Sequence, residues 1–137
     1  MIAMQTASKI LIVGGLGNLL FGFLFGFVVS RTRLADSESE DYGTSDVHLG
    51  SLLQGLVLLG LALAIGLSPL RARIESGAAL VVVVGSIFQA LAAVAAWQAG
   101  YTSPFSARGI AYQLASINMI LTVLGIGVLT IGAIKGL

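Results

Sequence analysis

The sequence predicts an all-α integral membrane protein, a four-transmembrane-helix antiparallel bundle that forms a single domain over residues 1–137. Hydrophobic residues make up 57% of the chain and charged residues only 9%, whereas soluble domains carry about a quarter charged residues. The apolar residues form four runs, each long enough to cross roughly 30 Å of hydrocarbon with about 20 helical residues. Backbone groups in lipid must bond within their own segment, so each run is predicted to be a helix.

The predicted helices cover residues 10–30, 48–67, 77–99 and 110–134. The first run is too long for the apolar core of a signal peptide and lacks a clear cleavage site, so we expect a retained helix. A tight turn at residues 68–73 joins the second and third helices, and a loop at residues 100–108 joins the third and fourth.

The first loop, residues 31–46, carries five acidic residues. We expect a solvated cap rather than a cation site, because the acids lack the ordered spacing of a calcium loop. They are Asp36, Glu38, Glu40, Asp41 and Asp46.

Basic residues predict the orientation only by a narrow margin. Four of them fall on the side of the termini and three on the opposite side, which favours cytoplasmic termini in a bacterial inner (cytoplasmic) membrane. The first set is Lys9, Arg71, Arg73 and Lys135, and the second is Arg31, Arg33 and Arg108. A net charge of +1 gives no signal for nucleic-acid binding, and the absence of cysteine excludes disulfides and thiolate metal sites.

Small residues occur within the predicted helices at spacings that allow close packing. Gly22-x3-Gly26 and Gly132-x3-Gly136 have the spacing that lets helix backbones approach one another, and the third helix is rich in alanine. Packing is the favoured interpretation, although small residues also leave room for a flat ligand between helices.

Five amide side chains interrupt the apolar runs, and most fall at overlapping depths. They are Asn18, Gln54, Gln89, Gln113 and Asn118. They have two interpretations: hydrogen bonds between helices, or the polar end of an otherwise apolar ligand pocket. Gln54, Gln89 and Asn118 are the candidate catalytic residues, and Gln54 is the best of them.

The single histidine, His48, opens the second apolar run. An ionisable group at the bilayer boundary is costly, so it marks a candidate functional site, and histidine is the most versatile metal ligand among side chains. The alternative is that His48 faces lipid headgroups or caps the helix together with Ser45 and Asp46.

Three short motifs resemble a family of small four-helix membrane isomerases that includes styrene oxide isomerases and hydroxylaminobenzene mutases. The motifs are His48-x5-Gln54-Gly55, Leu19-Leu20-Phe21-Gly22 and Gly85-Ser86-Ile87. The resemblance spans nearly the whole chain in helix order and length. The family has asparagine where this chain has Gln54.

The resemblance implies that His48 ligates haem b in a homotrimer and that ferric iron acts as a Lewis acid. It places the family's third-helix asparagine at Gln89 and its active-site tyrosine at Ala93, so this chain lacks that tyrosine. Met119 is the only plausible second ligand inside the bundle, and core packing is its favoured role. An open sixth position suits catalysis, whereas two strong axial ligands suit electron transfer.

The leading functional hypothesis is therefore a haem-dependent membrane isomerase. Its substrate would be a small apolar aromatic molecule, an arylhydroxylamine or an aromatic epoxide, that enters from lipid and is rearranged without net redox change. The near absence of carboxylates and lysines inside the membrane fits such a reaction. The competing hypotheses are a non-catalytic b-type haem subunit and a structural subunit of a larger membrane complex.

Overall fold

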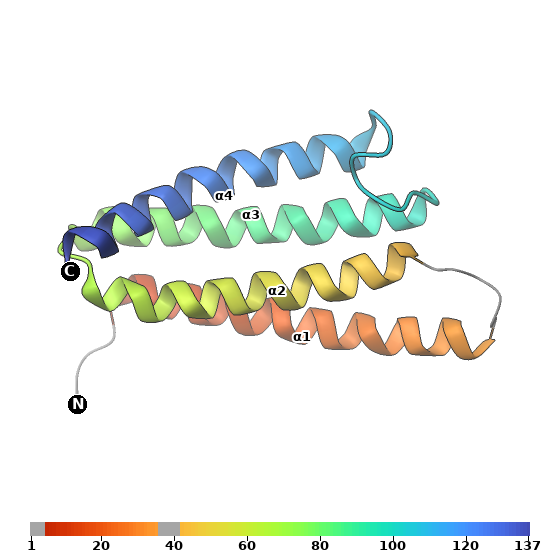
Figure 1. Ribbon diagram of the computed structural model, residues 1–137, viewed down its shortest axis with the longest axis horizontal. Helices are drawn as coiled ribbons and strands as arrows, with labels where there is room; N and C mark the ends of the chain where they lie inside the picture. The colour runs from red at the N-terminus through yellow and green to blue at the C-terminus, as the bar shows by residue number, and fades with distance from the viewer. Residues whose placement is uncertain (1–4, 36–41) are drawn as a thin grey trace.

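The computed structural model describes residues 5–35 and 42–137, and it confirms the predicted all-α four-helix bundle (Figure 1). The helices are α1 (Thr6–Ala35), α2 (Tyr42–Ala64), α3 (Ala72–Gln98) and α4 (Ile110–Lys135). A short 3-10 turn, η1 (Ile65–Leu67), ends the second helix. Each of the four long helices is long and apolar enough to cross a membrane.

Three of the helices begin earlier than the apolar runs predict. The first helix starts at Thr6, α2 at Tyr42 and α3 at Ala72. An apolar run marks the part of a helix that crosses lipid, but polar residues beyond it continue the helix without a new nucleation step. The early start of α3 places Glu75 in its first turn, where the Glu75 amide bonds to Arg71 O at 3.2 Å. Asp36, Glu38, Glu40 and Asp41 of the acidic loop lie outside the described residues.

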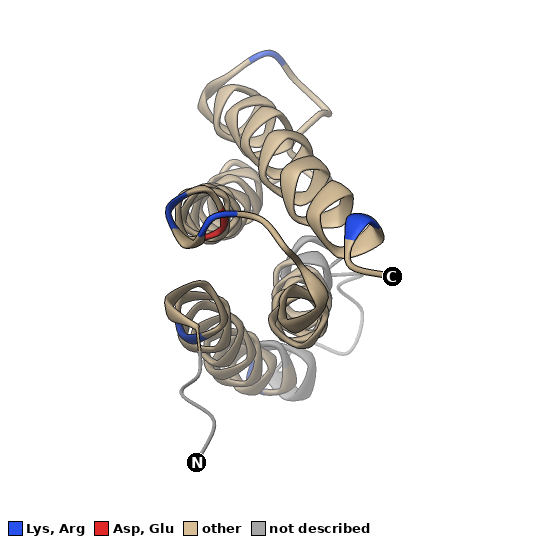
Figure 2. Cartoon of the chain, turned by 90° about the vertical axis from the view of Figure 1, so that its left-hand side faces the viewer, with Lys and Arg blue, Asp and Glu red and all other residues tan. Residues whose placement is uncertain are grey.

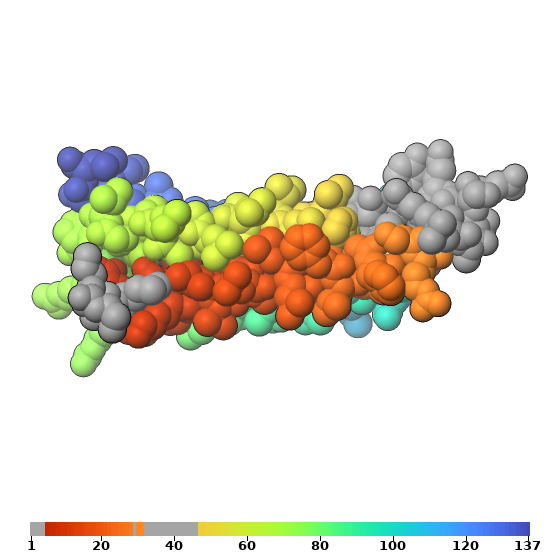
Figure 3. Space-filling view, turned by 90° about the horizontal axis from the view of Figure 1, so that it is seen from below, coloured from red at the N-terminus to blue at the C-terminus, as the bar shows by residue number. Residues whose placement is uncertain are grey.

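The bundle consists of two antiparallel hairpins. The contact between the two hairpins is less extensive than the contact between the two helices within each hairpin. The first two helices lie side by side along the molecule (Figures 1 and 3), and α3 pairs with α4. The third helix also packs on α1 and α2, whereas α4 is in contact mainly with α3 and η1. Residues on α3 are therefore the ones best placed to connect the two hairpins.

The basic residues of the terminal side gather at one end of the bundle, where α1 begins and α4 ends (Figure 2). Lys9, Arg71, Arg73 and Lys135 are all exposed there. The hydrophobic core lies towards this same end and includes Leu11, Leu58, Ile65, Ala79 and Val82.

Glycines set the distance between α1 and α2. A Cβ atom on Gly55 would lie 2.8 Å from Gly15 O, and a Cβ atom on Gly22 would lie 2.9 Å from Leu52 Cδ2. The Gly22-x3-Gly26 motif therefore does permit close helix contact, as predicted. The Gly132-x3-Gly136 motif packs instead on the turn between α2 and α3, where Gly132 faces Ser68 and Leu70.

We predict that Gly55→Ala destabilises the bundle by about 1–3 kcal/mol, the scale of overpacking a tightly filled interface. The added methyl group meets the backbone oxygen of Gly15, which has no rotamer with which to avoid it. Gly60→Ala is the matched control on the same helix, because nothing lies within 4 Å of its Cβ position. Unfolding in mixed detergent micelles measures both variants, and equal stability would contradict the packing described above.

Candidate functional site

His48 lies in α2 near the start of its membrane-spanning segment, Val47–Leu67, and its imidazole is turned towards α1. Its Nδ1 atom is 2.6 Å from Gly22 O. A carbonyl oxygen only accepts hydrogen bonds, so Nδ1 must carry the proton and donate it. In the neutral ring this leaves the lone pair on Nε2, the nitrogen that can then ligate a metal.

Gly26 provides the space in which the imidazole lies. A Cβ atom on Gly26 would lie 2.6 Å from His48 Cε1 and 2.7 Å from Nδ1, but 3.3 Å from Nε2. The Nδ1–Cε1 edge of the ring therefore packs against the α1 backbone, and Nε2 lies farther from it. Any side chain larger than glycine at this position would displace the ring from Gly22 O.

This geometry bears on the alternative roles of His48. Because α2 begins at Tyr42, His48 lies well inside the helix and does not cap it, contrary to the alternative considered from the sequence. Its Nδ1 bonds to the neighbouring helix rather than to headgroups. The side chains of Ser45 and Asp46 lie outside the described residues.

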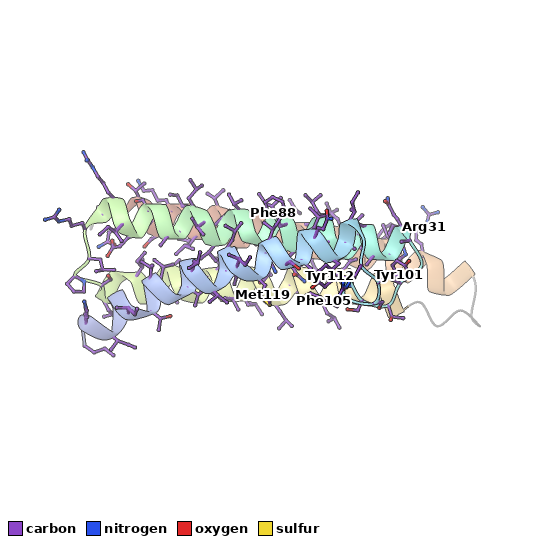
Figure 4. All side chains as sticks on the ribbon, turned by 90° about the horizontal axis from the view of Figure 1, so that it is seen from above. Arg31, Phe88, Tyr101, Phe105, Tyr112 and Met119 are labelled. Carbon is purple, nitrogen blue, oxygen red and sulfur yellow. The ribbon has the colours of Figure 1, made fainter. Side chains whose placement is uncertain are left out.

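The described residues offer no group of three or more His, Asp or Glu side chains that could hold a bare metal ion. A single imidazole binds a metal firmly only when the metal brings other ligands of its own, as haem iron does. Met119 does not pack in the core, contrary to expectation. It is 56% exposed on α4, and Figure 4 labels it among the side chains of that helix.

The amides of the predicted polar layer separate into two hydrogen-bonded groups. In the first, Asn18 Nδ2 donates to Gly14 O and to Ser86 Oγ, both at 2.9 Å, and Ser86 Oγ donates to Val83 O. This group joins α1 to α3. Ser86 is fully buried, so the bond between the two hairpins is shielded from competing partners.

The second group joins α3 to α4 and includes a residue that the sequence analysis missed. Asn118 Nδ2 donates to Gln89 Oε1 at 2.7 Å, and Thr122 Oγ1 donates to Asn118 Oδ1 at 2.9 Å. The spacing of Asn118 and Thr122, one helical turn apart, was the signal that could have identified the pair. The interpretation that Gln89 and Asn118 form a hydrogen bond between helices is therefore confirmed.

Gln54 belongs to neither group. Its Nε2 atom is buried and has no hydrogen-bond partner within the described residues. Buried polar atoms are nearly always satisfied, so an unpaired one in a native site calls for an explanation such as an absent ligand. The hydrogen bonds of the described residues therefore do not explain why a buried amide lies at Gln54.

The face of α2 that carries Gln54 is turned towards α3, and His48 is turned towards α1. Gly50 and Gln54 are four residues apart and share one face of α2. Gln89 Nε2 lies 3.9 Å from the position that a Cβ atom on Gly50 would occupy, so this face is turned to α3. His48 faces α1 instead. Gln113 is exposed near the start of α4.

A cavity of about 510 Å³ lies between α1 and α3, away from these residues. Its lining is apolar except near Asn18 and Ser86, and neither His48 nor Gln54 takes part in it. The cavity has the size of a small-molecule site, but it is not the Gln54-ended pocket that the sequence predicted.

The aromatic residues of the third loop lie at the end of the bundle where Arg31 lies (Figure 4). Phe105 and Tyr112 form an edge-to-face pair with ring centroids 5.9 Å apart. Tyr101 and Tyr112 are both exposed, whereas Ala93 is buried on α3. The tyrosine side chains that the structure describes therefore lie outside the interior of the bundle.

One acidic side chain inside the bundle was not anticipated. Glu75 is only 2% exposed, and its Oε1 atom has no hydrogen-bond partner among the described residues. It lies in the first turn of α3, at the end opposite His48. The sequence analysis missed it because Glu75 precedes the predicted start of the third helix.

Comparison with known protein families, with curated proteins and with solved structures finds no match to this chain.

We predict that the neutral form of His48 is the Nδ1–H tautomer, because only that tautomer donates to Gly22 O. Nitrogen-15 NMR of histidine-labelled protein distinguishes the two tautomers. Gly26→Ala should abolish the preference by displacing the ring, and Gly17→Ala, where nothing lies within 4 Å, serves as its control. An Nε2–H tautomer in the unmodified protein would refute the arrangement.

Proposed function

We propose that this chain is a haem b-dependent membrane isomerase that rearranges a small aromatic substrate, an arylhydroxylamine or an aromatic epoxide, without net redox change. The observation that carries the proposal is the hydrogen bond from His48 Nδ1 to Gly22 O, which leaves Nε2 as the ligating nitrogen. Haem-ligating and other metal-ligating histidines commonly donate their second N–H to a carbonyl in this way, which fixes the tautomer and the ring orientation.

The donor set fits haem better than a bare metal. His48 is the single histidine of the chain, and the described residues contain no cluster that could complete a coordination sphere. A porphyrin supplies the four equatorial nitrogens itself, so one imidazole is sufficient. The exposed position of Met119 supports a sixth position without a strong protein ligand, which suits catalysis rather than electron transfer.

When bound, ferric haem supplies a Lewis acid that polarises a C–O or N–O bond, so no acidic side chain is needed for that step. Gln54 would orient the substrate by donating a hydrogen bond from Nε2, which has no partner among the described residues. Gln89 and Asn118 would complete the polar side of the site, with the Gln89 amide held by its bond to Asn118.

His48 and Gln54 lie on different faces of α2, so one protomer does not enclose a site between them. We propose a homo-oligomer, a trimer, in which a neighbouring copy helps to enclose the haem held by His48. We place the protein in the bacterial cytoplasmic membrane with cytoplasmic termini, and we propose that the apolar substrate enters from lipid.

We predict that His48→Ala abolishes the haem absorbance of the purified protein while the helical circular dichroism remains. The variant removes the nitrogen that holds the iron but leaves the backbone contact between α1 and α2 intact. Added imidazole should restore part of the Soret band by occupying the vacated space. A normal haem spectrum in His48→Ala would exclude this residue as the ligand, and a purified protein without haem would favour a structural subunit.

We predict that Gln54→Leu lowers turnover by about 10²-fold, the scale of one lost preorganised donor, with haem content near normal. Leucine has a similar length but no hydrogen-bonding group, so packing should largely survive. Gln98→Leu is the control at an exposed site. Product analysis with styrene oxide and with phenylhydroxylamine provides the measurement. Full turnover in Gln54→Leu would return this amide to a packing role, and haem-loaded protein that converts neither compound would favour a non-catalytic haem subunit.

A further inference from the structure

The hydrogen bonds between α3 and α4 run in one direction. The Thr122 hydroxyl donates to Asn118 Oδ1, and Asn118 Nδ2 donates to Gln89 Oε1. Each amide oxygen in this series of hydrogen bonds therefore accepts a bond from the preceding member of the series. Thr122 is the first donor of the series, and Gln89 is its last acceptor.

This order of hydrogen bonds determines which end of the Gln89 amide has no hydrogen-bond partner. An amide carries its oxygen on one side and its NH2 group on the other, so a bond to Oε1 turns Nε2 away from Asn118. Nε2 lies instead beside Gly50 of α2, 3.9 Å from the position of a Cβ atom there. It makes no hydrogen bond within the part of the chain that the structure describes.

A second NH2 group lies on the same side. Gln54 follows Gly50 by one turn on α2, and its Nε2 atom is buried without an acceptor. Two amide NH2 groups, one on α2 and one on α3, thus make no hydrogen bond within the described residues. A ligand group that pairs with them must carry an acceptor atom, such as an oxygen, because a group that only donates would leave both NH2 groups unpaired.

Gly85 provides the space in which the first hydrogen bond of this series, from Thr122 to Asn118, forms. A Cβ atom at Gly85 would lie 2.9 Å from Thr122 Oγ1 and 3.4 Å from Asn118 Oδ1. The glycine therefore lets the Thr122 hydroxyl and the Asn118 oxygen meet against the backbone of α3. Alanine at this position would push the Thr122 hydroxyl from its present place.

We propose that Thr122 is a positioning residue that acts through Asn118 to fix the Gln89 amide with its NH2 group towards Gln54, which makes the site between α2 and α3 selective for an acceptor oxygen. The role of this selectivity in catalysis rests on the proposed function. The orientation of the amide does not, because it follows from hydrogen bonds of this chain alone.

The first test measures amide orientation by NMR of the full-length protein in detergent micelles, with glutamine and asparagine side chains labelled with nitrogen-15. Thr122→Val keeps the shape of threonine but removes the hydroxyl. It should shift the side-chain resonances of Asn118 and Gln89, and Thr122→Ser should restore them. Thr130→Val is the control, because Thr130 is exposed on the same helix. Unchanged Gln89 resonances in Thr122→Val would overturn the proposal.

The second test measures selectivity with three aromatic probes of similar size. Acetophenone offers only an acceptor, indole offers only an N–H donor, and ethylbenzene offers neither. Acetophenone should bind the unmodified protein about fivefold more tightly than ethylbenzene, the scale of one net hydrogen bond, and should shift the Gln54 and Gln89 amide protons. Part of this preference should be lost in Thr122→Val, where the Gln54 amide still donates, and all of it should persist in Thr122→Ser. A preference for indole would mean that the Gln89 amide has the opposite orientation, and would refute the proposal.

Gly85→Ala provides an independent variant if Thr122→Val does not fold. It should reproduce the partial loss of preference for acetophenone without removing any polar group, and retention of the full preference would count against the proposal. None of these measurements uses haem or turnover. A protein that binds no haem but shows the Gln89 response would refute the proposed function alone, and an active haem protein without that response would refute the present inference alone.

Discussion

The candidate site depends on how closely the backbones of α1 and α2 approach each other. Gly15 and Gly55 remove side chains from the centre of this contact, and Gly22 and Gly26 remove them from the part beside Leu52 and His48. The carbonyl of Gly22 then comes within 2.6 Å of the imidazole. A wider separation would leave Nδ1 without this acceptor, and the tautomer of His48 would no longer be determined by the fold. The same close packing that stabilises the hairpin therefore sets the chemistry of its histidine.

Apolar surface gives little drive for helices to associate in lipid, so packing and a few polar contacts must hold the two hairpins together. The third helix makes a polar contact on each side: Ser86 bonds to Asn18 of α1 in the other hairpin, and Gln89 bonds to Asn118 of α4 within its own hairpin. Gln54 is of the same residue type and lies in the same layer, but its Nε2 atom has no partner among the described residues. The two glutamines of one layer therefore differ in whether the described part of the fold satisfies their amides.

The distribution of polar groups also limits the chemistry available to the protein. Around His48 the described residues provide a carbonyl and glycine backbone rather than carboxylates or further imidazoles. Glu75, the buried acid, lies at the opposite end of the bundle. Under the function proposed above, a reaction near His48 would depend on a bound group for its electrophile and on amides for orientation. Neutral amides suit an apolar substrate, because they recognise an oxygen atom without placing a net charge in the membrane.

The sequence by itself determined the four spanning helices, their antiparallel order, the gathering of basic residues at one end, and the presence of amides in a common layer. These features follow from the length and polarity of each segment, which are properties of the local sequence alone. It misjudged where α2 and α3 begin, and so placed His48 at a helix start and overlooked Glu75, because helices continue beyond the apolar residues that reveal them. Only the tertiary structure decided which helix His48 faces, which amides pair, and that Thr122 joins them. Those outcomes depend on the rotation and separation of neighbouring helices, which glycine contacts constrain and which no single segment encodes.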